Sequence, residues 1–84
     1  MIEIEYLESI GFVDTKNDRK YGFIRLENQY RDVSLYSDGM WSYDNTIMDF
    51  EEMLYKMVLS GYIKSVDEYK LFKRDKSIKQ LLNK

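Results

Sequence analysis

The side chains that most often carry out catalysis are missing from this sequence. Its 84 residues include no histidine and no cysteine. That removes the commonest general base, the thiolate nucleophile and the usual ligands of zinc. Catalysis would have to rely on carboxylates, lysine, tyrosine or serine alone. We therefore expect a protein that is not an enzyme.

Two groups of carboxylates are the remaining candidates for binding a cation. The first, between Asp14 and Asp18, lacks the loop glycine and the distant glutamate of a calcium-binding EF-hand. The second, between Asp44 and Glu52, is explained by turn and helix-capping positions. The sequence also contains no glycine-rich phosphate loop and no nucleophile elbow. We expect no metal, no cofactor and no nuclease chemistry.

Aromatic residues make up 15% of the chain and indicate more about its function than the carboxylates do. Asp38-Gly39 predicts a two-residue β-hairpin turn of type I′, with Ser37 paired to Met40. Successive side chains of a strand point to opposite faces of the sheet. This register therefore separates an aromatic face from an aliphatic one: Tyr36, Trp41 and Tyr43 lie opposite Val33, Leu35 and Met40.

An aromatic face bordered by acidic residues is typical of a surface that binds another protein. Tyr21 and Phe23 of the preceding strand would extend this face, and an acidic rim would suit a basic target. The alternative is that a helix covers the aromatic residues and makes them a second core layer. The predicted partner-binding residues are Tyr36, Trp41, Tyr43, Asp32, Asp38 and Asp44.

Charge is unevenly distributed along the chain, whose net charge is −2. Residues 1–52 carry 12 acidic and 5 basic side chains, whereas residues 53–84 carry 3 acidic and 8 basic ones. Lysine and arginine bind phosphates without sequence preference, so the basic segment is an alternative, nucleic-acid-binding site. A solvated helix face explains the same residues and is the favoured interpretation. The alternative nucleic-acid-binding residues are Lys70, Lys73, Arg74 and Lys76.

The elements that must position these residues form a single small α+β domain, residues 1–84. Residues 2–10 fit either a strand or a short helix, and Gly11-Phe12 favours a helix that ends in a Schellman-type motif. An antiparallel meander of three to four strands follows over residues 12–43. Lys16–Asp18 and Asn28–Arg31 are its predicted turns, and Asp44–Thr46 is predicted to end the sheet.

The clearest helix is predicted over residues 49–60, with Asp49 as N-cap, Glu52 at the capping-box position and Gly61 at its end. One apolar stripe runs along it and should cover the aliphatic face of the sheet: Phe50, Met53, Leu54, Met57 and Val58. Ser65 and Glu68 repeat the capping-box spacing. Residues 66–82 then form either one helix or two.

Neither export nor membrane association is expected. No apolar run approaches the ~20 residues that span a bilayer, and the first five residues are acidic where a secretory signal is basic. We therefore expect a cytoplasmic protein that binds a larger protein, with the identity of the partner and the oligomeric state left open.

The sequence resembles small proteins of phages and mobile elements. The resemblance covers residues 7–60: Leu-Glu-Ser-Ile-Gly-Phe, a charged turn, an aromatic meander and a capped helix, in a chain without Ala, Pro or Cys. Among proteins of this style, inhibitors of host-defence nucleases (anti-CRISPR proteins) share the size and the lack of catalytic residues. The resemblance implies inhibition of a host-defence nuclease by a protein located in the cytoplasm of a phage's host.

Overall fold

The computed structural model describes residues 1–16 and 19–82. Over these residues the fold is a five-stranded antiparallel meander in which each strand pairs with the next along the chain. The strands are β1 Val13–Asp14, β2 Phe23–Glu27, β3 Asp32–Tyr36, β4 Trp41–Tyr43 and β5 Thr46–Met48. The helices are α1 Ile2–Ser9, α2 Phe50–Leu59 and α3 Asp67–Leu82, with a short 3₁₀ helix, η1, at Arg19–Tyr21. The predicted α+β class is confirmed, with five strands in place of three to four.

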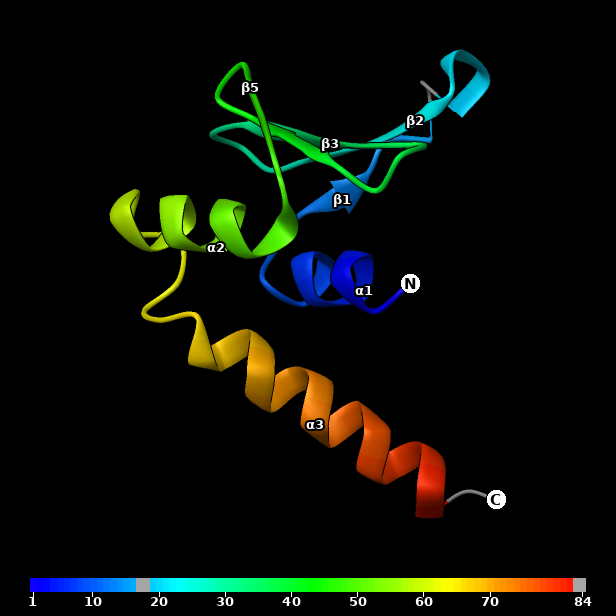
Figure 1. The fold of residues 1–84 in the computed structure, drawn as a ribbon, viewed down its shortest axis with the longest axis vertical. Coiled ribbons are helices and arrows are strands. Elements are labelled where there is room, and N and C mark those ends of the chain that lie inside the picture. Colours follow the sequence, from blue (N-terminus) through cyan, green and yellow to red (C-terminus); the bar gives the residue numbers. More distant parts are fainter. Residues whose placement is uncertain (17–18, 83–84) are drawn as a thin grey trace.

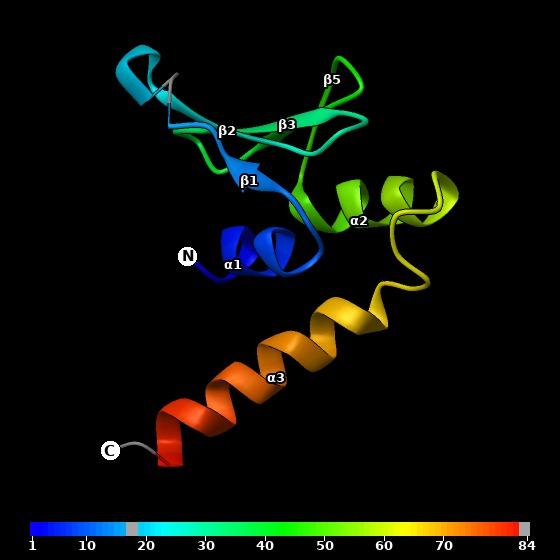
Figure 2. The same cartoon turned by 180° about the vertical axis from the view of Figure 1, so that it is seen from behind.

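The three α-helices lie on the same side of the sheet. Figures 1 and 2 show α1 and α2 directly against it and α3 beyond them, so the opposite face of the sheet carries no α-helix among the described residues. We call this opposite face the open face. The sheet is antiparallel and can bury one face while leaving the other in water. This layering decides which side chains are available to a partner.

The β3–β4 hairpin has a different register from the predicted one. Leu35 pairs with Trp41, and the Tyr36 N–H donates to the Met40 carbonyl at 2.9 Å, so the loop has three residues and not two. Gly39 takes a φ of +85°, whereas a type I′ turn would also need a positive φ at Asp38. A three-residue loop with glycine in this conformation is the next most common hairpin connection.

This shift of one residue moves two of the three aromatic side chains, Trp41 and Tyr43, to the other face of the sheet. Trp41 and Tyr43 lie beside Leu35 and Val33 on the core side, and Trp41 is 0% exposed. The prediction that Tyr36, Trp41 and Tyr43 share one face is therefore wrong. Met40 lies at the end of the loop, ahead of β4.

The prediction that the sheet ends at Asp44–Thr46 is wrong. Asp44 and Asn45 form a turn that leads the chain into a fifth strand. Their φ values of +54° and +63° are those of a two-residue type I′ turn, and Tyr43 pairs with Thr46 across it. Asp and Asn tolerate this left-handed conformation better than most residues. Figure 1 shows this turn rising beyond the plane of the sheet, next to the β5 label.

Helix α2 forms as predicted. The Asp49 carboxylate accepts the Glu52 N–H at 2.8 Å. At the other end Gly61 has a φ of +81°, and the Tyr62 N–H donates to the Met57 carbonyl, which is the Schellman pattern. Its apolar stripe joins the core between sheet and helices: Tyr6, Leu7, Phe12, Leu26, Val33, Leu35, Trp41, Tyr43, Met48, Phe50, Met53, Leu54, Met57 and Ile63.

The structure decides between the alternatives that the sequence left open for residues 2–10 and for residues 66–82. Residues 2–9 form a helix, and Gly11 and Phe12 close it with the predicted Schellman hydrogen bonds to Glu8 and Leu7. Residues 67–82 form one helix and not two. At its start the Glu68 carboxylate accepts the Lys64 N–H at 3.3 Å.

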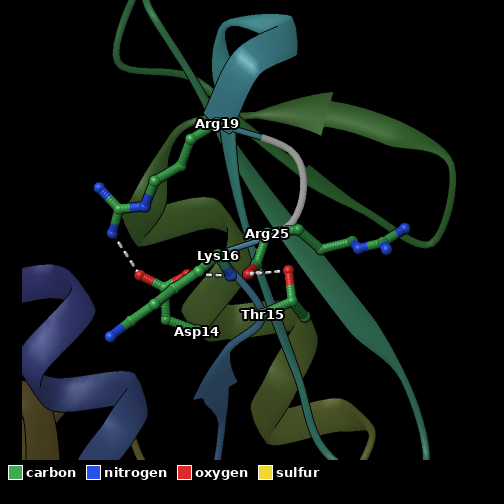
Figure 3. A network of polar contacts seen from close by, with 5 residues as sticks. All are labelled: Asp14, Thr15, Lys16, Arg19 and Arg25. Atoms are coloured by element: carbon green, nitrogen blue, oxygen red, sulfur yellow. Dashed lines mark hydrogen bonds and ion pairs between the residues drawn. The ribbon is translucent and has the colours of Figure 1, made fainter.

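The segment between β1 and β2 is held by a small polar network (Figure 3). Asp14 accepts the Lys16 N–H at 2.9 Å and forms an ion pair with Arg19, while Thr15 donates to the Arg25 carbonyl. The predicted turn at residues 16–18 lies partly outside the described residues. Tyr21 belongs to η1, so it does not extend a strand face as predicted.

Candidate functional site

The open face is built from the outward-pointing side chains of β2 to β5. Cross-strand pairing arranges them in rows, because directly opposite residues of neighbouring strands share a face. An aromatic row, Phe23 and Tyr36, lies at one end. A central row, Arg25, Ser34, Ser42 and Ile47, crosses four strands. An acidic row, Glu27 and Asp32, lies at the other end.

Of the predicted aromatic face, only Phe23 and Tyr36 of the aromatic row lie on the open face among the described residues. The rings of Phe23 and Tyr36 are 5.7 Å apart and inclined at 43°. Tyr36 is 36% exposed, and Phe23 is partly exposed. Burial in the core does not account for this pair, since the core lies on the other side of the sheet. The pair therefore offers an apolar surface that another molecule could contact.

A polar hollow of about 300 Å³ lies where the β4–β5 turn stands beside the open face. It is lined by hydroxyl, carboxylate, amide and guanidinium groups: Tyr30, Arg31, Asp32, Ser34, Ser42, Asp44 and Asn45. Asp32 and Asp44, two of the predicted partner-binding residues, thus reach the same hollow. Arg31 and the two serines have no recognisable motif around them and could not be identified from the sequence.

Arg31 is fixed in place by two tyrosine rings. Its guanidinium carbon lies 4.4 Å from the ring centroid of Tyr43 and 5.3 Å from that of Tyr62. Its Nε donates to the Tyr62 hydroxyl at 3.1 Å, and Asp44 lies 3.7 Å away. The hydrogen bond with Tyr62 raises the pKa of Arg31, so this charge is permanent. Arg31 therefore ties the β4–β5 turn to the end of α2.

The remaining predicted partner-binding residues are dispersed. Asp38 accepts the Met40 N–H at 3.0 Å and so stabilises the β3–β4 loop, at the far end of the sheet from the hollow. Trp41 and Tyr43 lie in the core and are not available on the surface. The structure thus brings together Asp32 and Asp44, leaves Tyr36 on the same face, and removes Trp41 and Tyr43 from the predicted partner-binding surface.

The alternative, basic set of residues does not form one stripe on α3. Lys76 points to the body of the protein, where it lies 4.0 Å from Glu5, and Lys73 interacts with Glu3. Lys70 and Arg74 are exposed, and Arg74 lies about 160° around the helix from Lys76. Phosphates along one strand could not meet all four side chains on a single face.

Within residues 1–16 and 19–82 no cluster of three or more metal-binding side chains occurs. None of the helices in the described part of the chain is long and apolar enough to cross a membrane. Comparison with family models, curated proteins and solved structures finds no match to this chain. Any function must therefore be inferred from its own surfaces.

Proposed function

We propose that this protein is a non-catalytic protein-binding module that acts through the open face of its sheet. The observation that supports this most strongly is the partly exposed pair Phe23 and Tyr36 on a face that carries no α-helix among the described residues. Tyrosine and other aromatic residues contribute a large share of binding energy at protein interfaces. The central serines are small and allow close approach of another surface.

We propose further that the partner is a basic, nucleic-acid-binding protein. Glu27, Asp32 and Asp44 border the open face, and the two aspartates are partly neutralised by Arg25 and Arg31 at 3.9 and 3.7 Å. The acidic charge that is left would speed association with a basic target. We propose a host-defence nuclease as this partner, because an enzyme that binds nucleic acid needs a basic channel to do so. Stoichiometric inhibition of such an enzyme requires no catalytic residue, in agreement with the lack of histidine and cysteine.

The second candidate, a small nucleic-acid-binding regulator that uses α3, receives less support from the geometry. Two of its four basic residues, Lys73 and Lys76, face Glu3 and Glu5 and are partly neutralised there. Binding of nucleic acid would have to rely on Lys70 and Arg74, and two exposed charges give little affinity at physiological salt.

A capture experiment tests this proposal. The full chain is immobilised, exposed to bacterial lysate with and without nuclease treatment, and compared with the variants Tyr36→Ala and Tyr55→Ala. Tyr55 is the matched control, because it is an exposed tyrosine on α2, on the helical side of the molecule. We expect a protein that is retained after nuclease treatment by wild type and Tyr55→Ala but lost with Tyr36→Ala. Loss of every partner after nuclease treatment would favour the second candidate instead.

A further inference from the structure

Strand β5 forms one edge of the sheet and is the last strand in its order. Tyr43 and Thr46 flank a two-residue loop, so they exchange both hydrogen bonds of their pair, and hydrogen-bonded pairs then alternate along the hairpin. Thr46 and Met48 therefore direct their N–H and C=O groups to β4. Ile47, which lies between them, directs both of its backbone groups outward, away from the sheet.

The outward N–H and C=O groups of Ile47 are open to another chain. Among residues 1–16 and 19–82, no turn or loop hydrogen bond involves them, and the Ile47 side chain is 55% exposed. Many sheet edges are protected against strand pairing by a lysine or a proline, and β5 contains neither. An edge of this kind is a template for an added strand.

A hollow of about 240 Å³ lies beside this edge, between β5 and α2. Figure 1 shows β5 running from the β4–β5 turn directly to α2. Met48 lines the hollow from the strand, and Glu52 and Leu59 line it from the helix. In a strand added to β5, the residue beside Ile47 would point to the open face and its two neighbours would point to the α2 side. One of these neighbours would enter the hollow.

The charges around β5 indicate which side chain would enter. Asp49 follows the strand and Glu52 lines the hollow, and neither takes part in an ion pair among the described residues. Asp44 precedes the strand and is partly neutralised by Arg31 at 3.7 Å. Lys56 also lines the hollow, but it leaves the Glu52 carboxylate without an ion pair. A lysine or arginine on the incoming strand would supply the missing charge.

We propose that the protein partner adds an extended, basic segment to β5 as a sixth strand of the sheet. The segment forms two backbone hydrogen bonds with Ile47 and places a lysine or arginine in the hollow, with its aliphatic part against Leu59 and its charge near Glu52. The added strand also continues the central row of the open face. The inference rests on the proposed function for the basic protein partner and specifies the segment that this partner must offer.

A second copy of this chain fits the same edge less well. In a two-fold antiparallel pair of β5 strands centred on Ile47, Asp49 of each copy would lie opposite Asn45 and next to Asp44 of the other. Carboxylates would then meet at both ends of the pair, and like charges across strands are destabilising. A basic segment of another protein avoids this repulsion.

A capped peptide, Val-Lys-Val-Lys-Val, tests the edge without knowledge of the partner. Its central valine would lie beside Ile47, and its lysines would face α2. We expect the Ile47 amide of the ¹⁵N-labelled full chain to shift downfield in a saturable manner, with a dissociation constant of about 1 mM. The amides of Thr46 and Met48 should shift less, because they already donate to β4. The matched control Val-Glu-Val-Glu-Val should cause no saturable shift.

Three results of this titration would overturn the proposal. The first is an Ile47 amide that does not move up to about 10 mM of the lysine peptide. The second is equal binding of the two peptides. The third is an Ile47 amide that shifts when the protein alone is diluted, because a second copy would then occupy the edge.

Two variants at Ile47 test the contact with the captured partner. Ile47→Pro removes the outward N–H, and an edge strand tolerates proline where this group faces solvent. Ile47→Ala is the matched control, since it shortens the side chain and keeps the N–H. We expect Ile47→Pro to bind about tenfold more weakly than Ile47→Ala, as for the loss of one hydrogen bond. Urea denaturation checks that both variants fold, and if Ile47→Pro does not, the peptide titration decides.

The outcomes distinguish failure of this inference from failure of the proposed function. Equal binding of Ile47→Pro and Ile47→Ala, with binding lost in Tyr36→Ala, would overturn the sixth strand and leave the open face as the binding surface. Binding that is weakened by Ile47→Pro but unchanged by Tyr36→Ala would support the sixth strand and contradict the open face.

Discussion

Gly39 shows how one backbone conformation determines which side chains this protein presents. Its positive φ closes a three-residue loop, and that loop length sets the register of β3 with β4. The register in turn directs Trp41 into the core and leaves Tyr36 outside. A residue that resists this conformation would strain the loop.

We expect Gly39→Val to destabilise the fold, while Gly39→Asn is nearly neutral. A Cβ at this position meets no atom within 4 Å, so the two variants differ in backbone strain and not in packing. The left-handed conformation costs a β-branched residue about 1–2 kcal/mol or more, and asparagine adopts it readily. Urea denaturation of the three proteins measures the difference. Equal midpoints for Gly39→Val and wild type would contradict the role assigned to Gly39.

Glu3 is the residue whose ionisation should be visible in the stability of the fold. Burial raises the pKa of its carboxyl above the usual value of 4.5, and the Trp41 indole N–H and Lys73 offset this only in part. The indole N–H makes no hydrogen bond in the described part of the structure, so burial dominates at Glu3. The folded state therefore holds the proton of Glu3 more tightly than the unfolded state does.

The sign of the pH dependence follows from this. A raised carboxyl pKa stabilises the folded protein below the unfolded value, and this contribution is lost as the pH rises through the folded value. We expect Glu3→Gln to gain stability relative to wild type as the pH is raised from about 4 to 7. The other carboxylates contribute equally to the pH dependence of both proteins, so their contributions cancel in the stability difference. A stability difference that stayed constant or fell with pH would show that Glu3 is not held in this environment.

At the scale of elements, α2 divides cleanly into a buried and an exposed side. Leu54 is 1% exposed, whereas Leu59, five residues further on the same helix, is 83% exposed. The two leucines are therefore a matched pair for testing how the helix packs on the sheet.

We expect Leu54→Ala to lower the free energy of unfolding by about 2–5 kcal/mol, because it leaves a cavity in the core. Leu59→Ala should change it by no more than about 0.5 kcal/mol. Thermal or urea denaturation of both variants provides the measurement. Similar losses in the two variants would mean that α2 packs through a different face.

The helices could be predicted from the sequence because their signals are local. The Asp49 cap, the Gly11 and Gly61 ends and the apolar stripe of α2 each involve residues a few positions apart, and each is present in the structure. The register of β3 with β4 could not be predicted from a local signal, because Asp38-Gly39 is compatible with hairpin loops of two or three residues. Which one forms depends on whether the core accepts Trp41, a tertiary effect.

The candidate site was correspondingly less predictable than the fold. An error of one residue in register reversed the faces of Trp41 and Tyr43 but left the alternation of β2 intact. Strand β5 has only three residues, too few for a period-two pattern to stand out. Arg31 could not be assigned a role because its two tyrosine partners lie 12 and 31 residues away in the sequence.

At the scale of the whole molecule, two surfaces lie on opposite sides of one core. The open face carries the Phe23–Tyr36 pair and a rim of carboxylates. Helix α3, on the far side of α1 and α2 from the sheet (Figures 1 and 2), carries exposed leucines with basic neighbours. The fold thus places the proposed partner-binding face and α3 on opposite sides of the molecule.

The central claim is that the open face contacts the partner, and NMR mapping tests it most directly. The ¹⁵N-labelled protein is titrated with the protein captured by the wild-type chain, and amide shifts are followed. We predict that the largest changes occur at Phe23, Arg25, Ser34, Tyr36 and Ser42, with little change along α3. Changes confined to α3, with the amides of β2 to β4 unaffected, would contradict the account.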